Sequence, residues 1–230
     1  MIDVFRNCRA VMDNIGAAAK RSGRDPGEIK LLAACKSHGV SIIRAAIEAG
    51  VRLLGENYVQ EARPKVQALG EGLEWHLIGH LQRNKAREAV ELFSVIESVD
   101  SAELARRLDR EANRKGKICR TLIEVNLGGE KTKRGVSDQA LPALLEEVGN
   151  LSNLQVEGLM LVPPFRADPQ ETRPFFRDLK KLQLKLEALK IPNVDLRELS
   201  MGMTHDYEVA VEEGATIVRI GTAIFGERRR

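Results

Sequence analysis

The sequence is poor in aromatic residues, in cysteine and in long apolar runs. Phe, Trp and Tyr make up 4% of the 230 residues, and the three cysteines, Cys8, Cys35 and Cys119, are odd in number and widely spaced. Such spacing fits neither a disulfide framework nor a set of metal ligands. No stretch approaches the roughly 20 apolar residues that a membrane span needs, and the first residues lack the apolar core of a secretory signal. We therefore expect a cytoplasmic protein with no membrane contact and no bound metal.

The sequence also has little excess of charge of either sign. The 36 basic residues exceed the 33 acidic residues by a net charge of +3. An excess of this size does not indicate a nucleic-acid partner. The three arginines at 228–230 are a concentrated basic patch, and we interpret them as a solvated tail.

The most prominent pattern in the sequence is that short apolar runs alternate with amphipathic segments. Apolar residues at 4, 8, 11, 12 and 15 predict an opening helix, which ends at the breaker 24–27. Eight strand-like runs follow, each leading into a helix, at 31–36, 51–55, 75–78, 93–99, 119–125, 156–162, 196–201 and 216–220. Three of the intervening helices are predicted at 57–69, 137–149 and 205–213. We predict one domain over 1–230, a closed (β/α)8 barrel with an extra N-terminal helix; a doubly wound open sheet is the alternative.

The first of these runs, residues 31–36, ends in a single lysine, Lys36. At the carboxyl end of a barrel strand this side chain would lie at the mouth of the active site. Burial lowers the pKa of a lysine, and a neutral amine can attack an aldehyde. A lysine that merely ends a strand and reaches solvent is the other interpretation, and this stretch leaves both open.

The loops after the seventh and eighth strands, 200–204 and 221–223, contain glycine and hydroxyl side chains. Phosphate often binds at these two loops of a barrel, where backbone N–H groups and a helix N-terminus favour an anion. Alternation along 216–221 places Arg219 toward the barrel interior. A guanidinium there needs a fixed acceptor, and either a structural carboxylate such as Glu124 or a ligand could supply it.

Two other patterns carry no chemistry. The glycines of 221–226 have P-loop spacing, but Glu227 and the arginine after it replace the required Lys-Ser/Thr. His76 and His80 are four residues apart, which on a strand separates them by roughly 13 Å, too far to share one metal ion. We expect His76 to be packed or hydrogen-bonded, and His80 to lie in the following loop.

Several motifs together resemble those of the pyridoxal phosphate homeostasis proteins, which are relatives of the N-terminal barrel domain of alanine racemase. The resemblance covers essentially the whole chain. The motifs that carry it are Gly-Glu-Asn-Tyr-Val-Gln-Glu at 55–61, the segments 75–85 and 124–126, Leu-Ser-Met-Gly-Met at 199–203 and Val-Arg-Ile-Gly-Thr-Ala-Ile-Phe-Gly at 218–226.

The resemblance implies that pyridoxal 5′-phosphate (PLP) is held as an aldimine on Lys36. It further implies phosphate contacts from Ser200, Gly221 and Thr222, with Arg219 directed at the pyridine nitrogen. The remaining residues of the expected cofactor site are Asn57, near the ring, and Met201, from the same motif as Ser200.

The sequence departs from the family pattern at two places. His38 stands where the family has a second lysine after the Schiff-base lysine, so a role assigned to that lysine does not carry over. Thr204 stands where serine is usual and keeps a hydroxyl. His80, Thr204 and Lys133, the last in a Lys-x-Gly-Val loop, are secondary candidates for the site.

Arginine does not give up its proton, so Arg219 would leave the pyridine nitrogen unprotonated and weaken the electron sink that PLP enzymes use. Racemisation also needs a base on each face of the substrate. The racemase takes its second base from a C-terminal β domain, which we expect this chain to lack, and neither Tyr58 nor Tyr207 matches that tyrosine. We therefore expect a PLP carrier without robust turnover.

The expected carrier stores, buffers or delivers the cofactor and is not an enzyme. Its partners would be PLP and, transiently, PLP-dependent apoenzymes, and the carrier itself would be a monomer. The alternatives are a small PLP-dependent amino-acid racemase and a Schiff-base aldolase that forms its lysine adduct with substrate alone.

Overall fold

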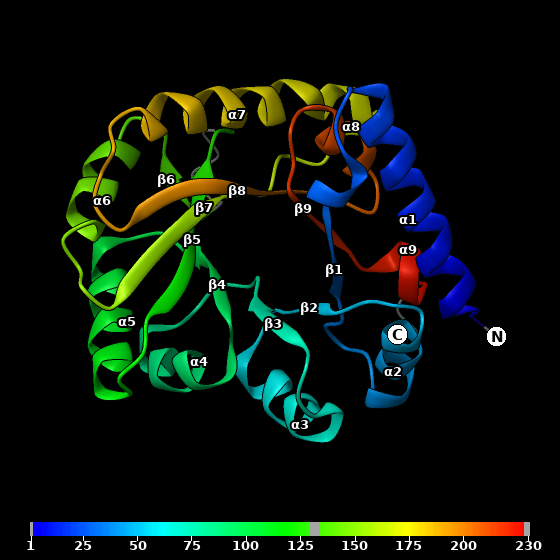
Figure 1. Cartoon of the computed structure of the whole chain (residues 1–230), viewed down its shortest axis with the longest axis horizontal. Helices are drawn as coiled ribbons and strands as arrows, with labels where there is room; N and C mark the ends of the chain where they lie inside the picture. The colour runs from blue at the N-terminus through cyan, green and yellow to red at the C-terminus, as the bar shows by residue number, and fades with distance from the viewer. Residues whose placement is uncertain (1, 129–133, 228–230) are drawn as a thin grey trace.

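The computed structural model describes residues 2–128 and 134–227, and its centre is a closed barrel of parallel strands (Figure 1). Within the described residues the barrel strands are β1 (Lys30–Ala34), β2 (Leu53–Glu56), β3 (Glu74–Leu77), β4 (Val95–Val99), β5 (Cys119–Asn126), β7 (Leu154–Leu161), β8 (Val194–Met203) and β9 (Ile217–Ile220). The ring closes because β1 pairs with β9 and β4 pairs with β5. The predicted (β/α)8 barrel is confirmed, and the open sheet is wrong. A two-residue strand, β6 (Val136–Ser137), lies beside β5 outside the ring.

Helices surround the barrel (Figure 1). The α-helices are α1 (Val4–Arg21), α2 (Val40–Glu48), α3 (Val59–Leu69), α4 (Ala86–Leu92), α5 (Ala102–Arg114), α6 (Leu141–Val148), α7 (Arg173–Glu187), α8 (Tyr207–Glu212) and α9 (Thr222–Phe225). Short 3-10 helices are η1 (Pro26–Glu28), η2 (Arg83–Lys85) and η3 (Pro169–Thr172). In the described part of the chain no helix is both long enough and apolar enough to cross a membrane.

Side chains alternate between two apolar layers because successive residues of a strand point to opposite faces. The larger layer lies between the strands and the helices. The smaller layer fills the inside of the barrel and consists of Leu32, Ala34, Leu53, Val95, Leu122, Met160 and Ile217. Polar side chains share the barrel with the apolar ones. Arg120, at the start of β5, pairs with Glu74 and Glu157, and a second polar group surrounds Arg219 of β9.

The predicted extra helix is present as α1 and packs against α8 and α9 (Figure 1). Its buried side includes Val4, Cys8, Val11 and Ile15. The amide of Asn14 donates to the hydroxyl of Tyr207 over 3.0 Å, and this bond ties α1 to α8. Tyr207 is thus engaged in the helical layer.

Three helices begin later than predicted. Asn57 and Tyr58 belong to the loop before α3, and Tyr58 is extended. Ser137 lies in β6 opposite Asn126, so α6 begins at Leu141. The helix predicted from 205 begins at Tyr207. In each case the residues after the strand form a loop at the carboxyl end of the barrel.

Candidate functional site

Lys36 follows the end of β1 at the mouth of the barrel. The chain keeps its pairing with β2 as far as Cys35, whose N–H donates to the carbonyl of Gly55 over 2.9 Å. It then turns sharply, because Ser37 has a left-handed φ of 64° and the N–H of His38 returns to the carbonyl of Cys35. Lys36 is half-buried inside this turn.

Two neighbouring helices, α3 and α9, hold the lysine turn. Lys65 of α3 donates to the carbonyl of Cys35 over 3.0 Å and to Glu56 over 2.6 Å. The carboxylate of Glu61, also on α3, accepts from the N–H of Ser37 over 3.2 Å. The ring of His38 lies 4.8 Å from the ring of Phe225 in α9, measured between centroids. The residue that replaces the family's second lysine therefore packs the turn against α9.

The predicted phosphate loop lies beside the lysine turn. Because β1 pairs with β9, Gly221 lies next to the end of β1, and a Cβ on this glycine would lie 3.3 Å from the carbonyl oxygen of Ala34. Thr222 is exposed and begins α9, and the first N–H groups of a helix have no partners within it. The hydroxyl of Thr204, at the end of β8, accepts from the N–H of Ala223 over 3.2 Å. Thr204 thus lies beside Gly221 and Thr222. We call these three residues the candidate anion-accepting corner.

Arg219 points into the barrel, as its alternation predicted, and is 5% exposed. Its guanidinium donates to the hydroxyl of Ser200 over 2.6 Å and to the carbonyl of Leu161 over 2.8 Å. Burial lowers the pKa of Arg219, and the charges of Glu97, Glu124 and Asp206 oppose this. Glu124, the suggested partner, therefore acts through its charge, whereas Ser200 and Leu161 make the hydrogen bonds.

A fully buried carboxylate, Glu97 of β4, lies behind this arginine. One oxygen accepts from the hydroxyl of Ser200 over 2.5 Å and lies 4.0 Å from Arg219, and the other is 2.6 Å from Nδ1 of His76. Burial alone would raise the pKa of Glu97, but the hydrogen bond and charge of His76, the charge of Arg219 and the bond from Ser200 hold it below its usual range. Glu97 is therefore an ionised group inside the barrel.

His76 completes this chain of groups and is hydrogen-bonded, as expected. Burial disfavours the charged imidazole, but the contact of Nε2 with Glu74 over 3.5 Å and the hydrogen bond of Nδ1 with Glu97 raise the pKa of His76 overall. The pKa of Glu74 is lowered to about 2, chiefly by His76. Sequence reasoning found His76 and missed Glu97, although a glutamate within the apolar run of β4 was the available signal.

Ser200 and Met201 lie on opposite faces of β8. Both are fully buried, but Met201 packs in the layer between strands and helices, whereas the hydroxyl of Ser200 bridges Arg219 and Glu97 inside the barrel. The predicted phosphate contact of Ser200 stays a prediction.

Asn57 and His80 share a cleft of about 360 Å³ beside the barrel mouth, together with Tyr58, Lys85 and Arg134. The approach of the two loops is close, since a Cβ on Gly79 would lie 2.4 Å from the carbonyl oxygen of Asn57. Lys133, the third secondary candidate, falls outside the described residues. Among the residues that the structure describes, no group of three or more His, Cys, Asp or Glu side chains could hold a metal ion.

Glu124, near the carboxyl end of β5, gives the site a titratable group. Burial, with the charge of Asp100, raises its pKa from 4.5 to about 7. The folded state therefore binds a proton between these values that the unfolded state has released, so stability falls as pH rises from about 4.5 to 7. We expect the wild type to lose on the order of 2 kcal/mol relative to Glu124→Gln over this window. Urea unfolding of both cofactor-free proteins at several pH values measures this, and parallel pH profiles would contradict it.

Comparison with known proteins gives the family. The family model described as alanine racemase, N-terminal domain, matches residues 7–229, so the barrel is of that class. Relatives named pyridoxal phosphate homeostasis protein match nearly the whole chain. One from Aquifex aeolicus is 44% identical over 220 residues, 95% of this chain and 96% of its own. One from Escherichia coli is 40% identical over 232 residues, 99% of this chain and 98% of its own. The chain belongs to the pyridoxal phosphate homeostasis protein family.

Solved structures agree with this assignment. A protein from Bifidobacterium adolescentis has a TM-score of 0.92 and 38% identity, covering 97% of this chain and 94% of its own. PipY of Synechococcus elongatus, solved with PLP bound, has a TM-score of 0.82 and 40% identity, covering 92% and 100%. An alanine racemase of Clostridium difficile has a TM-score of 0.73 at 16% identity and covers 98% of this chain but 57% of its own, so this likeness concerns the fold.

Proposed function

We propose that this protein binds PLP and serves its homeostasis by storing, buffering or delivering the cofactor, without robust turnover of its own. The observation that carries the proposal is the convergence of three groups on the adjacent strands β8, β9 and β1. These are a lysine turn, an anion-accepting corner and a buried arginine. Family membership supports the same function.

PLP fits the residues present. Lys36 would hold the cofactor through its Nζ atom, at the aldehyde carbon. Gly221 and Thr222 would hold the phosphate, with Thr204 beside them. Arg219 would direct an N–H to the pyridine nitrogen, because its position is fixed by Ser200 and Leu161. The chemistry that PLP supplies when bound is an aldehyde that captures amines.

The cleft beside the mouth would complete the site. We propose that Asn57 lies near the ring and that His80, at the rim of the same cleft, is a secondary contact. Met201 would support the site by packing behind β8, and Ser200 would add to the phosphate contacts. Lys133 is proposed as a cationic contact next to Arg134, which lines the cleft.

Racemisation has less support. A racemase places a base on each face of its substrate. The hydroxyl of Tyr207 is engaged by Asn14 in the helical layer, and Tyr58 is 58% exposed at the rim of the cleft. Neither is placed as a fixed second base. A Schiff-base aldolase has less support still. It would form its lysine adduct without PLP, so it would not need Arg219 beside a pyridine ring.

We extend the proposal to the cellular location of the protein, its oligomeric state and its partners. The three cysteines are free and buried, which suits a reducing cytoplasm. We propose a single PLP-binding domain that is monomeric and meets PLP-dependent apoenzymes transiently, because a carrier has no need of a dimer.

The test is a visible absorption spectrum of the purified protein titrated with PLP, comparing Thr222→Ala with the wild type. Loss of one hydrogen bond to a charged phosphate is expected to weaken binding by about 1–3 kcal/mol. Ser41→Ala, an exposed serine on α2, is the control and should leave the affinity unchanged. A wild type that remains colourless with added PLP would refute the proposed function, and an unaffected Thr222→Ala would place the phosphate elsewhere.

A further inference from the structure

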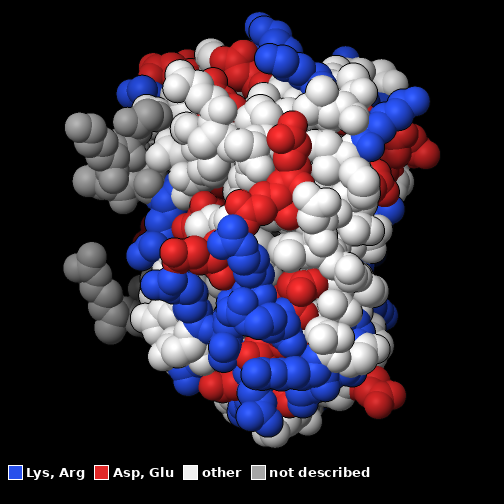
Figure 2. Space-filling model, turned by 90° about the vertical axis from the view of Figure 1, so that its left-hand side faces the viewer, with Lys and Arg blue, Asp and Glu red and all other residues white. Residues whose placement is uncertain are grey.

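A groove of about 390 Å³ lies on the outside of the barrel between η2 and α5. It is lined by Arg83, Asn84, Glu103, Arg106, Arg107 and Arg110. Its four arginines and one glutamate carry a net charge of +3, equal to that of the whole chain. Basic side chains gather on the face that carries this groove (Figure 2). The groove is therefore strongly basic, and its lining residues are not part of the proposed PLP site.

The arginines of α5 are placed at a cost to the helix. Its buried side is formed by Leu104, Ala105 and Leu108 among others. Arg110 follows Arg106 by four residues and Arg107 by three, so each pair is adjacent on the helix surface. Like charges at these spacings repel each other and destabilise a helix slightly.

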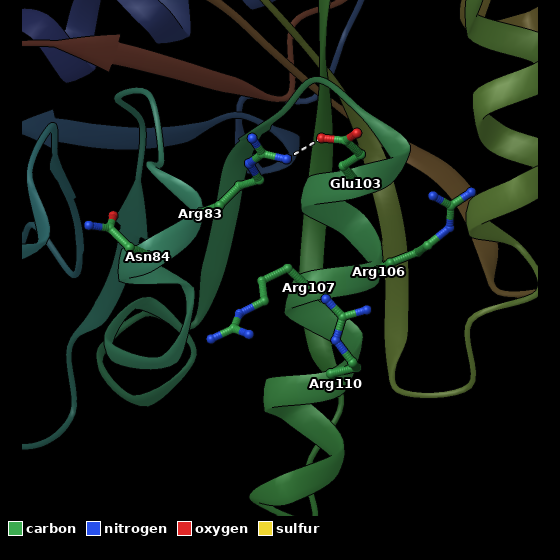
Figure 3. Close-up of a pocket in the computed structure, with 6 residues that line it drawn as sticks. All are labelled: Arg83, Asn84, Glu103, Arg106, Arg107 and Arg110. Carbon is green, nitrogen blue, oxygen red and sulfur yellow. Dashed lines mark hydrogen bonds and ion pairs between the residues drawn. The ribbon is translucent and has the colours of Figure 1, made fainter.

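The carboxylates near the groove leave part of its charge unmatched. Arg83 of η2 pairs with Glu103 of α5 across the groove (Figure 3). Arg107 extends from α5 toward η2, whereas Arg106 points to the other side of α5. Arg106 pairs with Glu147, and Arg107 lies 2.8 Å from Glu111.

Arg110 is the exception among these arginines. It is exposed, and within residues 2–128 and 134–227 its side chain has no hydrogen bond or ion pair. Its guanidinium turns up along α5 toward Arg107 (Figure 3). Arg107 and Arg110 thus both line the groove, and Arg110 has no partner among the described residues.

We propose that this groove binds a ligand that carries at least two adjacent phosphate groups. Guanidinium groups pair with phosphate oxygens through two parallel hydrogen bonds. A compact run of phosphates would relieve the repulsion between Arg107 and Arg110 and compete with Glu103 for Arg83. Among the described residues, no apolar or aromatic side chain lines the groove and could stack on a ring. Recognition is therefore of the phosphate chain, whether free or part of a larger molecule.

Isothermal titration calorimetry with inorganic tripolyphosphate tests the proposal. The protein is first saturated with PLP, so that a phosphate site in the barrel is filled, and magnesium is left out because it would bind the ligand. The variants are Arg110→Ala and, as a matched control, Arg9→Ala, an exposed arginine of α1. We expect one tripolyphosphate per chain, binding about tenfold weaker in Arg110→Ala, unchanged in Arg9→Ala, and weaker at high salt.

If wild type and Arg110→Ala bind tripolyphosphate equally, or if Arg9→Ala loses as much affinity as Arg110→Ala, binding is due to diffuse surface charge and not to the groove. Orthophosphate should bind much more weakly than tripolyphosphate, and equal binding would overturn the requirement for adjacent phosphates. A short oligouridylate that binds through Arg110 while tripolyphosphate does not would assign the groove to a nucleic-acid backbone instead. An unchanged PLP spectrum in Arg110→Ala separates this test from that of the proposed function.

Discussion

Replacing Lys36 by arginine is expected to abolish covalent retention of PLP while leaving the barrel folded. Arginine keeps the positive charge beside the anion-accepting corner but cannot form a Schiff base, because its guanidinium does not lose a proton. Lys36 lies in a turn beyond the end of β1, so its replacement removes no core side chain. Borohydride reduction followed by peptide mapping should label Lys36 in the wild type and nothing in the variant.

Two comparisons make this result specific. Lys117→Ala removes an exposed lysine before β5 and should leave the labelled peptide unchanged. Lys36→Ala removes the charge as well as the amine and should bind PLP more weakly than Lys36→Arg, because the charge contributes to phosphate attraction. A pyridoxyl group found on another lysine of the wild type would contradict the assignment of Lys36. Retained label in Lys36→Arg would do the same.

The barrel could be predicted from the sequence because each strand is a short apolar run followed by an amphipathic segment. Closure followed from the number of such runs, and the pairing of β1 with β9 bears it out. The ends of the helices could not be predicted as well. Ser137 has the residue type of a helix cap, and its hydroxyl accepts from the N–H of Ala140. Its backbone, however, pairs in β6 with Asn126 of β5, and α6 begins only at Leu141. Tertiary pairing of this kind overrides local preference, and no local pattern reveals it.

Likewise, one part of the candidate site could be predicted from the sequence and another part could not. Alternation within one strand placed Arg219 inside the barrel, since that inference needs no knowledge of neighbouring strands. The partner of Arg219 depends on which strands face each other across the interior, and Glu124 was as reasonable a candidate as Glu97. The register of β3 and β4 sets His76 opposite Val95 and so brings it close to Glu97. Sequence alone does not contain that register.

Replacing Glu97 by alanine is expected to destabilise the protein by about 3–5 kcal/mol, the usual consequence of removing one partner from a buried ion pair. His76 and Arg219 are both nearly fully buried, and both face Glu97. Without the carboxylate, the hydroxyl of Ser200 also loses its acceptor. Urea unfolding of the cofactor-free protein measures the loss, and Glu48→Ala, an exposed glutamate of α2, should change stability by less than about 0.5 kcal/mol.

Glu97→Gln separates the charge of Glu97 from its shape. The amide keeps the volume and can still accept from Ser200, so this variant should retain more stability than Glu97→Ala. It cannot stabilise a charged imidazole, so the pKa of His76, which contact with Glu74 and Glu97 raises, should fall. Proton NMR of the imidazole measures that fall. A Glu97→Ala protein as stable as Glu48→Ala would mean that water replaces the carboxylate, and that Arg219 is held by Leu161 and Ser200 alone.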